Sequence, residues 1–287
     1  MQHEVMAMQG LDQFYTNPAY AKECYDVLLA YLPKDMAEKA YFIDPSAGDG
    51  VFYDLLPAGR RAGVDVAPAH NRIKQADFLK WKPSRGTKPN RIVIGNPPFG
   101  KRGNLALQFL CHASEIADTT ALILPMCFSK HALQSKLPTD LRLLKQHDLK
   151  REAFRLPNGK PYKVKTEFQI WSRVIDGENF RQLEAEPIDH PDFDMYQYNN
   201  TKEALSVFDK KFNFAVPCQG WQNYKRRVRD AAKCEKNKQW MLFYATTKTI
   251  QERLENIDYG ELAYRVATAI PGFRKRDVVA EYKKHYA

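Results

Sequence analysis

Between Tyr41 and Trp171, short apolar segments alternate with longer amphipathic ones, and this alternation constrains the fold more than any other feature. In chain order the apolar segments read YFID, AGVDV, RIVIGN, ALILP, EAFRLP and EFQIW. Strands that alternate with helices form a mostly parallel sheet that helices cover on both faces. The pattern therefore predicts an α/β fold.

The segments between these strands predict helices at residues 18 to 31, which open on Pro18, and at residues 51 to 56, 104 to 117 and 128 to 136. The last two candidate strands, residues 152 to 157 and 167 to 171, are separated by NGKPY. This turn-rich stretch is too short for a crossover helix. We therefore predict that the two strands form an antiparallel hairpin at the end of the sheet.

The composition changes near residue 180. Residues 176 to 200 combine acidic, proline and asparagine residues with little periodicity, which indicates a boundary. An aromatic, basic stretch follows at residues 220 to 240, and residues 250 to 270 have helical spacing. We predict two domains, residues 1 to 180 and 181 to 287.

The net charge of +10 is segregated along the chain. Residues 81 to 160 carry 14 basic and 5 acidic groups, residues 161 to 200 carry 4 and 8, and residues 201 to 287 carry 18 and 10. Two basic stretches around an acidic one are expected of a protein that binds a polyanion, although solvated helix faces give the same count.

Several classes of protein are not expected. No apolar run approaches the roughly 20 residues of a membrane span, and MQHEVMAMQG lacks the basic and apolar regions of a secretory signal. We therefore expect a cytoplasmic protein without a membrane segment. The five cysteines are scattered with no CxxC pair, so reduced thiols are predicted rather than a metal site or disulfides.

The segment FIDPSAGDGVF, residues 42 to 52, predicts a strand, a loop of small residues and the start of a helix. Glycines let the backbone pass close to a ligand at the carboxyl end of the strand. The loop lacks the GK[ST] ending of a phosphate loop, and Asp44 and Asp49 would repel a pyrophosphate. These residues suit a cationic or hydroxyl-rich ligand instead.

Two further aspartates end the next apolar segments. Asp65 follows Asp44 by 21 positions, the spacing at which an acidic residue meets ribose hydroxyls in dinucleotide folds. Asp77, in QADFL, can accept a hydrogen bond from an adenine amino group. Each aspartate alone is typical of a turn or a cap, but three in register favour a nucleoside site.

The segment RIVIGNPPFG, residues 91 to 100, predicts a strand that delivers Asn96 to the same edge, followed by two prolines and the aromatic Phe99. The NPP tripeptide alone is also typical of a strand that ends in a turn. Placed after the acidic segments, it resembles the catalytic motif of amino-group methyltransferases that use S-adenosylmethionine.

The resemblance covers most of the first 175 residues. LDQFYTNPAYAKEC resembles the N-terminal cofactor motif of these enzymes, and FIDPSAGDG, GVDV, QADF and GNPPF follow in the family's order. LPNGKPYKVKTEFQIW is similar to a late segment of adenine methyltransferases of restriction systems. The motif order is similar to the gamma arrangement of DNA N6-adenine methyltransferases. It implies a Rossmann-like methyltransferase sheet and a small C-terminal domain that contacts DNA.

The resemblance also implies roles for the residues at the matching positions. S-adenosylmethionine is expected to be held by Tyr15, Thr16, Asp44, Pro45, Ser46, Ala47, Gly48, Gly50, Asp65, Asp77, Phe78 and Asn96. The expected catalytic residues are Asn96, Pro97, Pro98 and Phe99, and no metal is implied.

The chemistry of the adenine amine explains the residue types of this motif. The amine is a poor nucleophile while its lone pair is delocalised into the ring. The Asn96 side-chain oxygen and the Pro97 carbonyl would hold its two hydrogens out of the ring plane and aim the nitrogen at the methyl group. Catalysis would then consist of positioning and local dipoles.

A target adenine in duplex DNA must be extruded before it reaches such a pocket. Phe99 is expected to stack on the base, and Tyr162 or Phe154 to form a second aromatic wall, with Tyr162 preferred. The residues expected to bind DNA are Lys101, Arg102, Lys225, Arg226, Arg227 and Arg229.

Three alternatives remain at this point. The same chemistry can act on adenine in RNA, which we rank behind DNA, or on a glutamine side chain of a protein, although the related motif there usually ends in Tyr. The chain can also be a catalytically idle subunit that binds nucleic acid. Whether a restriction partner accompanies it is left open by the sequence.

Overall fold

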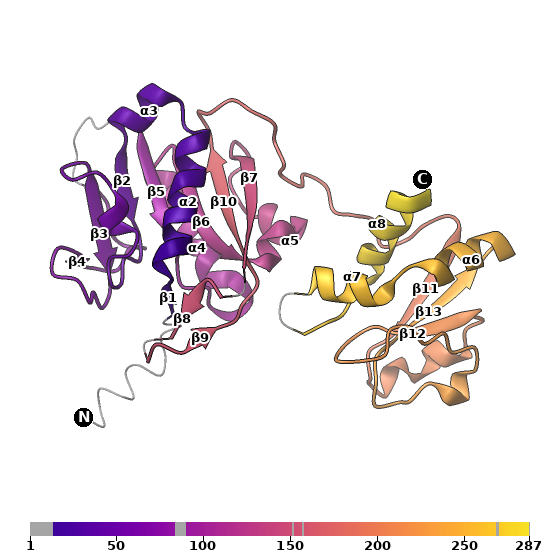
Figure 1. Cartoon of the computed structure of the whole chain (residues 1–287). Coiled ribbons are helices and arrows are strands. Elements are labelled where there is room, and N and C mark those ends of the chain that lie inside the picture. Colours follow the sequence, from indigo (N-terminus) through magenta and orange to yellow (C-terminus); the bar gives the residue numbers. More distant parts are fainter. Residues whose placement is uncertain (1–13, 84–89, 151, 157, 268–269, 287) are drawn as a thin grey trace. The chain divides into compact units, whose positions relative to one another are not determined.

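The structure is a computed structural model that describes residues 14 to 83, 90 to 150, 152 to 156, 158 to 267 and 270 to 286. The chain divides into two compact units (Figure 1). The first ends at Leu183 and the second begins at Glu184.

The first unit is built on a seven-stranded sheet with the strand order β4-β3-β2-β5-β6-β10-β7. The strands are β2 (Tyr41–Asp44), β3 (Arg61–Asp65), β4 (Lys74–Gln75), β5 (Arg91–Gly95), β6 (Thr119–Pro125), β7 (Arg142–Leu149) and β10 (Thr166–Ser172). Strands β4, β3, β2, β5 and β6 are parallel to their neighbours in this series, whereas β10 is antiparallel to both β6 and β7. The predicted α/β class with a mostly parallel, Rossmann-like sheet is confirmed. An antiparallel pair does end the sheet, but it consists of β10 and β7 rather than of the predicted hairpin.

Two long helices pack on this sheet, α2 (Pro18–Tyr31) and α4 (Asn104–Ile116), with the short α3 (Lys34–Lys39) after α2. Asn17 caps α2, because its side-chain oxygen accepts from the backbone N–H of Ala19 at 3.1 Å, and Pro18 occupies the first turn. Buried residues of both helices belong to the same core as the strands. Both helices are predicted from the sequence.

Two other predicted helices are wrong in type or extent. Residues 51 to 56 contain only the 3₁₀ turn η1 (Tyr53–Leu55), because the residue before Pro57 is driven into extended backbone. Residues 128 to 136 contain the end of the 3₁₀ turn η3 (Met126–Ser129) and the single-turn helix α5 (His131–Gln134), which extended backbone at Lys130 separates. A further 3₁₀ turn, η2 (Lys101–Gly103), leads into α4.

The strand predicted at residues 152 to 157 does not pair with residues 167 to 171. Only β8 (Phe154–Arg155) forms there, in a small sheet between β1 (Tyr15–Thr16) and β9 (Pro161–Tyr162). The antiparallel partners of β10 are instead β6 and the edge strand β7, whose sequence RLLKQHDL has no long apolar run. Such a sequence suits β7 because an edge strand pairs on one side only and keeps half of its side chains near solvent.

The second unit contains the antiparallel sheet β11-β13-β12, formed by β11 (Phe193–Tyr198), β12 (Phe214–Pro217) and β13 (Trp240–Ala245). The other elements are the 3₁₀ turns η4 (Glu203–Asp209) and η5 (Ala231–Lys233) and the helices α6 (Lys248–Asn256), α7 (Tyr259–Val266) and α8 (Lys275–Tyr286). The helical run predicted at residues 250 to 270 is thus interrupted. Ile257 is extended, and the Asp258 carboxylate caps α7 by accepting from Gly260 and Glu261 at 2.9 Å.

Within the described ranges, none of the helices combines the length and the apolar character that crossing a membrane requires.

Candidate active site

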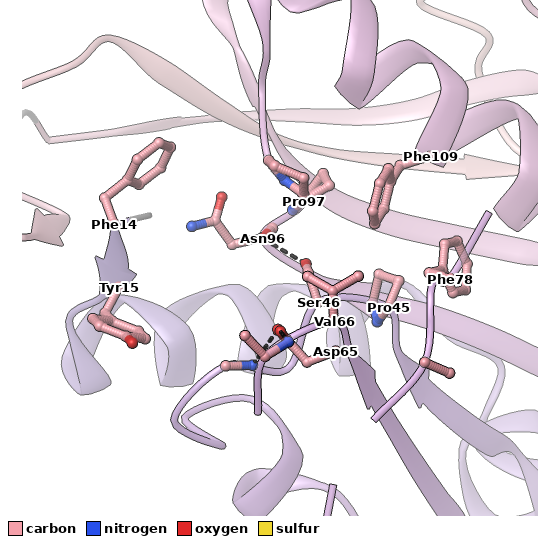
Figure 2. A pocket seen from close by; sticks show the side chains of 14 residues that line it. Phe14, Tyr15, Pro45, Ser46, Asp65, Val66, Phe78, Asn96, Pro97 and Phe109 are labelled. Atoms are coloured by element: carbon pink, nitrogen blue, oxygen red, sulfur yellow. Dashed lines mark hydrogen bonds between the residues drawn. The ribbon is translucent and has the colours of Figure 1, made fainter. Parts of the chain in front are cut away.

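A pocket lies at the carboxyl edge of the parallel strands, where β2, β3 and β5 end (Figure 2). Ligands of open α/β sheets bind at this edge because the loops after the strands converge there. Most of the lining residues lie at or just after the end of a strand, whereas Phe14 and Tyr15 lie at the start of β1 and Phe109 lies on α4. The lining residues are Phe14, Tyr15, Pro45, Ser46, Gly48, Asp65, Val66, Ala67, Ala76, Phe78, Asn96, Pro97, Pro98 and Phe109.

Asp44, at the end of β2, is buried beside a smaller adjoining cavity. Burial raises the pKa of its carboxyl from 3.8 to about 8, a value that also includes the lowering effect of the hydrogen bond from the Ser46 N–H and the raising effect of the nearby charges of Asp65 and Asp49. The approach of Asp44 requires a glycine at position 95, because a Cβ there would lie 2.6 Å from the Asp44 Oδ1. The site thus holds a carboxyl that a cationic group would stabilise in its ionised form.

Asp65, at the end of β3, shapes the loop after β2. Its Oδ2 accepts from the backbone N–H of Gly48 at 2.8 Å, and its Oδ1 accepts from that of Ala67 at 2.8 Å. Gly48 has a φ of +46°, and a Cβ there would lie 3.2 Å from the Tyr15 ring. The loop therefore passes close to β1 with its backbone facing the pocket, and the Asp65 oxygens retain lone pairs for a ligand hydroxyl.

Asn96 follows β5 and is joined to the loop after β2 through its backbone. The Ser46 hydroxyl donates to the Asn96 carbonyl at 2.8 Å (Figure 2). The Asn96 side-chain oxygen is buried, and no donor among the described residues reaches it. A buried polar atom without a partner costs on the order of 1–3 kcal/mol, so this oxygen is suited to a donor that arrives with a ligand.

Four aromatic rings gather beside Asn96. The Phe14 ring lies 4.9 Å from that of Phe99 and 5.1 Å from that of Phe154, both edge to face, and it stacks on Tyr162 at 5.1 Å. Phe154 is fully buried, whereas 39% of Tyr162 is exposed. Phe99 is also buried. Both residues expected as a second wall are therefore in the cluster, with Tyr162 the accessible one.

An ion pair ties this aromatic cluster to the acidic loop. The Arg155 guanidinium of β8 donates to the Asp49 carboxylate at 2.7 Å and lies 5.6 Å from the centre of the Tyr15 ring. Burial, and then the charges of Asp49 and Asp65, raise the pKa of the Tyr15 hydroxyl, so it is a neutral donor at physiological pH. The small sheet β1-β8-β9 is thus attached to the rim of the pocket.

The structure does not bring every predicted cofactor residue to the pocket wall. Thr16, Ala47 and Asp44 line the adjoining cavity. The Asp77 carboxylate instead accepts from the Leu79 N–H at 3.1 Å and pairs with Lys80 at 3.3 Å, while its neighbours Ala76 and Phe78 line the pocket. Gly50 has a φ of +90° and shapes the loop, donating to the Ala47 carbonyl at 2.7 Å.

Sequence reasoning missed several lining residues. Phe14 directly precedes the expected Tyr15, and Val66 and Ala67 directly follow Asp65, so extending each motif by one or two residues includes them. Phe109 carries no such signal. It lies on α4 among residues with the spacing of a helix that faces the core, and only the packing of the helix brings it to the pocket.

The basic residues expected to bind DNA differ in their surroundings. Lys101 and Arg102 are exposed on η2, directly after the NPPFG segment. In the second unit Lys225 is exposed, while Arg226 pairs with Glu235 at 2.7 Å and Arg229 pairs with Glu255 at 2.8 Å.

Arg227 serves the fold of the second unit. Its guanidinium donates to the carbonyls of Glu255 at 2.7 Å and Ile257 at 3.0 Å and lies 4.8 Å from the centre of the Tyr259 ring. Burial lowers the pKa of this group. Arg227 therefore holds the end of α6, which leaves its side chain occupied.

Among the described residues, no group of three or more His, Cys, Asp or Glu side chains is arranged to hold a metal ion.

No protein-family model and no curated protein matches the chain. Solved structures do share parts of its fold. A Pyrococcus horikoshii protein named as an RNA methyltransferase is 24% identical, with a TM-score of 0.43 over 58% of this chain and 88% of that one. The M protein of the type I restriction enzyme EcoKI is 13% identical, with a TM-score of 0.35 over 87% and 67%.

A third structure, the DrdV–DNA complex, is 13% identical, with a TM-score of 0.42 over 94% of this chain and 41% of that chain. At these identities the likeness concerns the fold. What the site does has to be argued from the residues of this chain.

Proposed function

We propose that the protein transfers a methyl group from S-adenosylmethionine to the N6 amino group of adenine in DNA. The observation that carries the proposal is the buried Asn96 side-chain oxygen, which no described residue satisfies. It lies in the Asn96-Pro97-Pro98-Phe99 turn, at the wall of a pocket lined by acidic strand ends and beside a cluster of aromatic rings. A ligand with an aromatic ring and an exocyclic amine meets each of these features.

The acidic residues of the pocket fit S-adenosylmethionine in type. The buried Asp44 would accept from the ammonium of the methionine part, which offsets the cost of an ionised buried carboxylate. Asp65 would accept from the ribose hydroxyls through its remaining lone pairs. Phe78, Phe109 and Val66 would pack against the adenine of the cofactor. When bound, S-adenosylmethionine would supply an activated methyl group on its sulfonium sulfur, which keeps the electron pair of the broken sulfur–methyl bond while the methylated amine loses one proton to solvent.

The chain's own contribution to the reaction is to orient the target amine. The Asn96 Oδ1 and the Pro97 carbonyl would each accept one N–H, which draws the nitrogen lone pair out of conjugation with the ring. The Ser46 hydroxyl holds the Asn96 backbone from the cofactor side at 2.8 Å. This bond couples the position of the amine to the loop that would hold the methyl donor, and orientation of this kind lowers the barrier.

The aromatic cluster would hold the extruded base. Phe99 offers an aromatic surface beside Asn96, and Tyr162 is the exposed member of the cluster. Phe14 lies between them, in contact with both rings. The base therefore has to displace Phe14 or stack against it, and the small sheet that carries Phe14 and Tyr162 is the element expected to adjust.

A nucleic acid is the proposed substrate because two exposed cations stand directly after the motif, and DNA is proposed ahead of RNA because the motif order resembles that of DNA N6-adenine methyltransferases. Lys101 and Arg102 would contact phosphates beside the extruded nucleotide, and such contacts position a strand without reading its sequence. The same contacts suit RNA. RNA is therefore an explicit arm of the test.

The proposal is tested by incubating the purified chain with labelled S-adenosylmethionine and, separately, duplex DNA, single-stranded DNA and RNA, followed by nucleoside mass spectrometry. N6-methyladenine in DNA is expected. An adenine-free strand of equal length is the matched substrate control and should take up no label.

Two other outcomes would contradict either the substrate or the methyl transfer itself. Label confined to RNA would keep the amine chemistry and overturn the substrate. Cofactor binding in calorimetry without transfer to any nucleic acid would favour an idle binding subunit or a protein target.

A further inference from the structure

Two exposed aromatic side chains of the second unit lie next to each other on its surface. Trp221 is 71% exposed and Tyr264 is 44% exposed, and their ring centres lie 5.9 Å apart. Ile270, 56% exposed, follows in the chain. We call Trp221, Tyr264 and Ile270 the aromatic platform. A Trp ring left mostly in water forgoes the free energy that its burial would contribute, so folding does not explain the exposure.

The backbone beneath the platform is held firmly although the side chains are exposed. The segment after β12 pairs with the segment before α8 through a bridge between Gln219 and Gly272, and the Gly220 N–H donates to the Pro271 carbonyl at 2.8 Å. The pairing is close, because a Cβ on Gly272 would lie 2.4 Å from the Gln219 side chain.

A buried aromatic layer supports the platform from below. Tyr224 is buried, contacts the Tyr264 ring at 6.3 Å and the Phe273 ring at 6.2 Å, and donates its hydroxyl to the Gly220 carbonyl at 2.5 Å. The main chain on both sides of Trp221 is therefore fixed. A rigid backbone that presents an exposed ring is preorganised for binding, since little entropy remains to be lost.

The charge around the platform indicates the occupant. Residues 221 to 229 and 264 to 276 carry eight basic and no acidic residues. Arg226, Arg229 and Arg265 are paired with glutamates of the same unit. Lys225 and Arg274 are exposed in these two segments. Two acids flank the segments in the sequence: Glu261 on α7 pairs with Arg265 at 3.7 Å, and the Asp277 carboxylate accepts from the Arg274 backbone N–H at 2.8 Å. A surface of this kind suits a chain that has both stacking faces and phosphates.

We propose that the aromatic platform binds an unpaired nucleotide of a DNA or RNA strand, with the base stacked on Trp221 and Tyr264 and the phosphates near Lys225 and Arg274. The inference rests on the proposed function only in that the substrate is a nucleic acid. It assigns the binding of the strand to exposed aromatic rings of the second unit rather than to its arginine cluster, which consists of Arg226, Arg227 and Arg229.

Intrinsic fluorescence of the full-length chain tests the platform directly. Of the four tryptophans, Trp171 and Trp240 are fully buried, Trp81 of the first unit is partly buried, and Trp221 is largely exposed. A twelve-nucleotide oligo(dT) or oligo(rU) should quench the Trp221 emission, whereas inorganic polyphosphate, which carries charge without bases, should not. Comparison of the two oligonucleotides separates a DNA preference from an RNA preference.

Variants then give the contribution to affinity, measured by anisotropy of a labelled oligonucleotide. Trp221→Ala should weaken binding by about tenfold or more and Tyr264→Ala by severalfold, because a base–aromatic stack is worth about 1–3 kcal/mol. Trp221→Phe keeps a stacking face and should stay within a few fold of the wild type. Leu205→Ala is the matched control, since Leu205 is a 42% exposed apolar residue of the same unit outside the platform.

An unchanged affinity of Trp221→Ala at low salt, or equal loss for Trp221→Phe and Trp221→Ala, overturns the inference. Circular dichroism and thermal melting establish that each variant is folded. The two proposals fail separately. Quenching by oligonucleotide without any methyl transfer removes the proposed reaction and keeps the platform, whereas methyl transfer with tight binding by Trp221→Ala removes only the platform.

Discussion

The pocket of the first unit and the arginine cluster of the second unit use their polar side chains in opposite ways. At the pocket, the Asn96 side-chain oxygen is buried without a partner among the described residues, and burial raises the pKa of the Asp44 carboxyl to about 8. In the cluster, Arg226, Arg227 and Arg229 all have partners within the same unit. An unsatisfied polar group at the wall of a pocket indicates a ligand, whereas an arginine whose donors are satisfied within its own unit indicates a structural role.

The largest expected effect is at the pocket. Asn96→Ala removes one of the two acceptors for the target amine, so the rate of methyl transfer should fall by roughly three orders of magnitude. Affinity for S-adenosylmethionine, measured by calorimetry, should stay close to that of the wild type. Asn199→Ala, at an exposed asparagine of the second unit, is the control. An active Asn96→Ala enzyme would show that this oxygen does not activate the amine.

The second prediction concerns Arg227, whose donors are satisfied within the second unit. Arg227→Ala leaves the carbonyls of Glu255 and Ile257 without a donor, so the free energy of unfolding should fall by about 2–4 kcal/mol. Arg227→Lys should recover only part of it, because an ammonium does not reproduce the planar fork. Thermal or urea unfolding measures both.

Arg229→Ala is the matched control, since its ion pair with Glu255 is exposed and should contribute about 0.5 kcal/mol. If Arg227→Ala melts like the wild type and binds DNA more weakly, Arg227 contacts phosphates and does not have the structural role that we assign to it.

A smaller effect concerns pH. The folded pKa of Asp44, about 8, lies above its ordinary value of 3.8, so the folded state holds a proton that the unfolded state has lost between these values. Asp44 therefore makes the free protein less stable as pH rises from about 4 to 8. The Asp44→Asn variant should lack this loss of stability with rising pH, as urea unfolding at several pH values can show. It should also bind S-adenosylmethionine more weakly. Parallel pH profiles for the two proteins would mean that Asp44 is already ionised.

The smallest effect concerns the exposed cations beside the motif. The double variant Lys101→Ala, Arg102→Ala should reduce the slope of log affinity for DNA against log salt by about one to two, with a modest loss of affinity at low salt. Lys34→Ala, at an exposed lysine before the sheet, is the control. An unchanged salt slope would show that these side chains do not contact phosphates.

Much of the first unit follows from local sequence. The strand segments YFID, AGVD and RIVIG are short apolar runs, and each is followed at once by polar or small residues, so the positions of Asp44, Asp65 and Asn96 at strand ends are predictable. The β7 strand and the partner of β8 are not, because an edge strand with polar residues and a two-residue strand acquire their pairing from distant segments.

The α/β class, the order of the strand-end loops and the place of the Asn96-Pro97-Pro98-Phe99 segment could be predicted from the sequence, because each depends on neighbouring residues. Which polar groups have a hydrogen-bond partner could not be predicted, because those partners come from distant parts of the chain. The Arg155 and Asp49 pair spans 106 positions, and Arg227 reaches carbonyls 28 and 30 positions away. Burial and hydrogen bonding are properties of such distant contacts, so the same residue type is structural at Arg227 and exposed at Arg102.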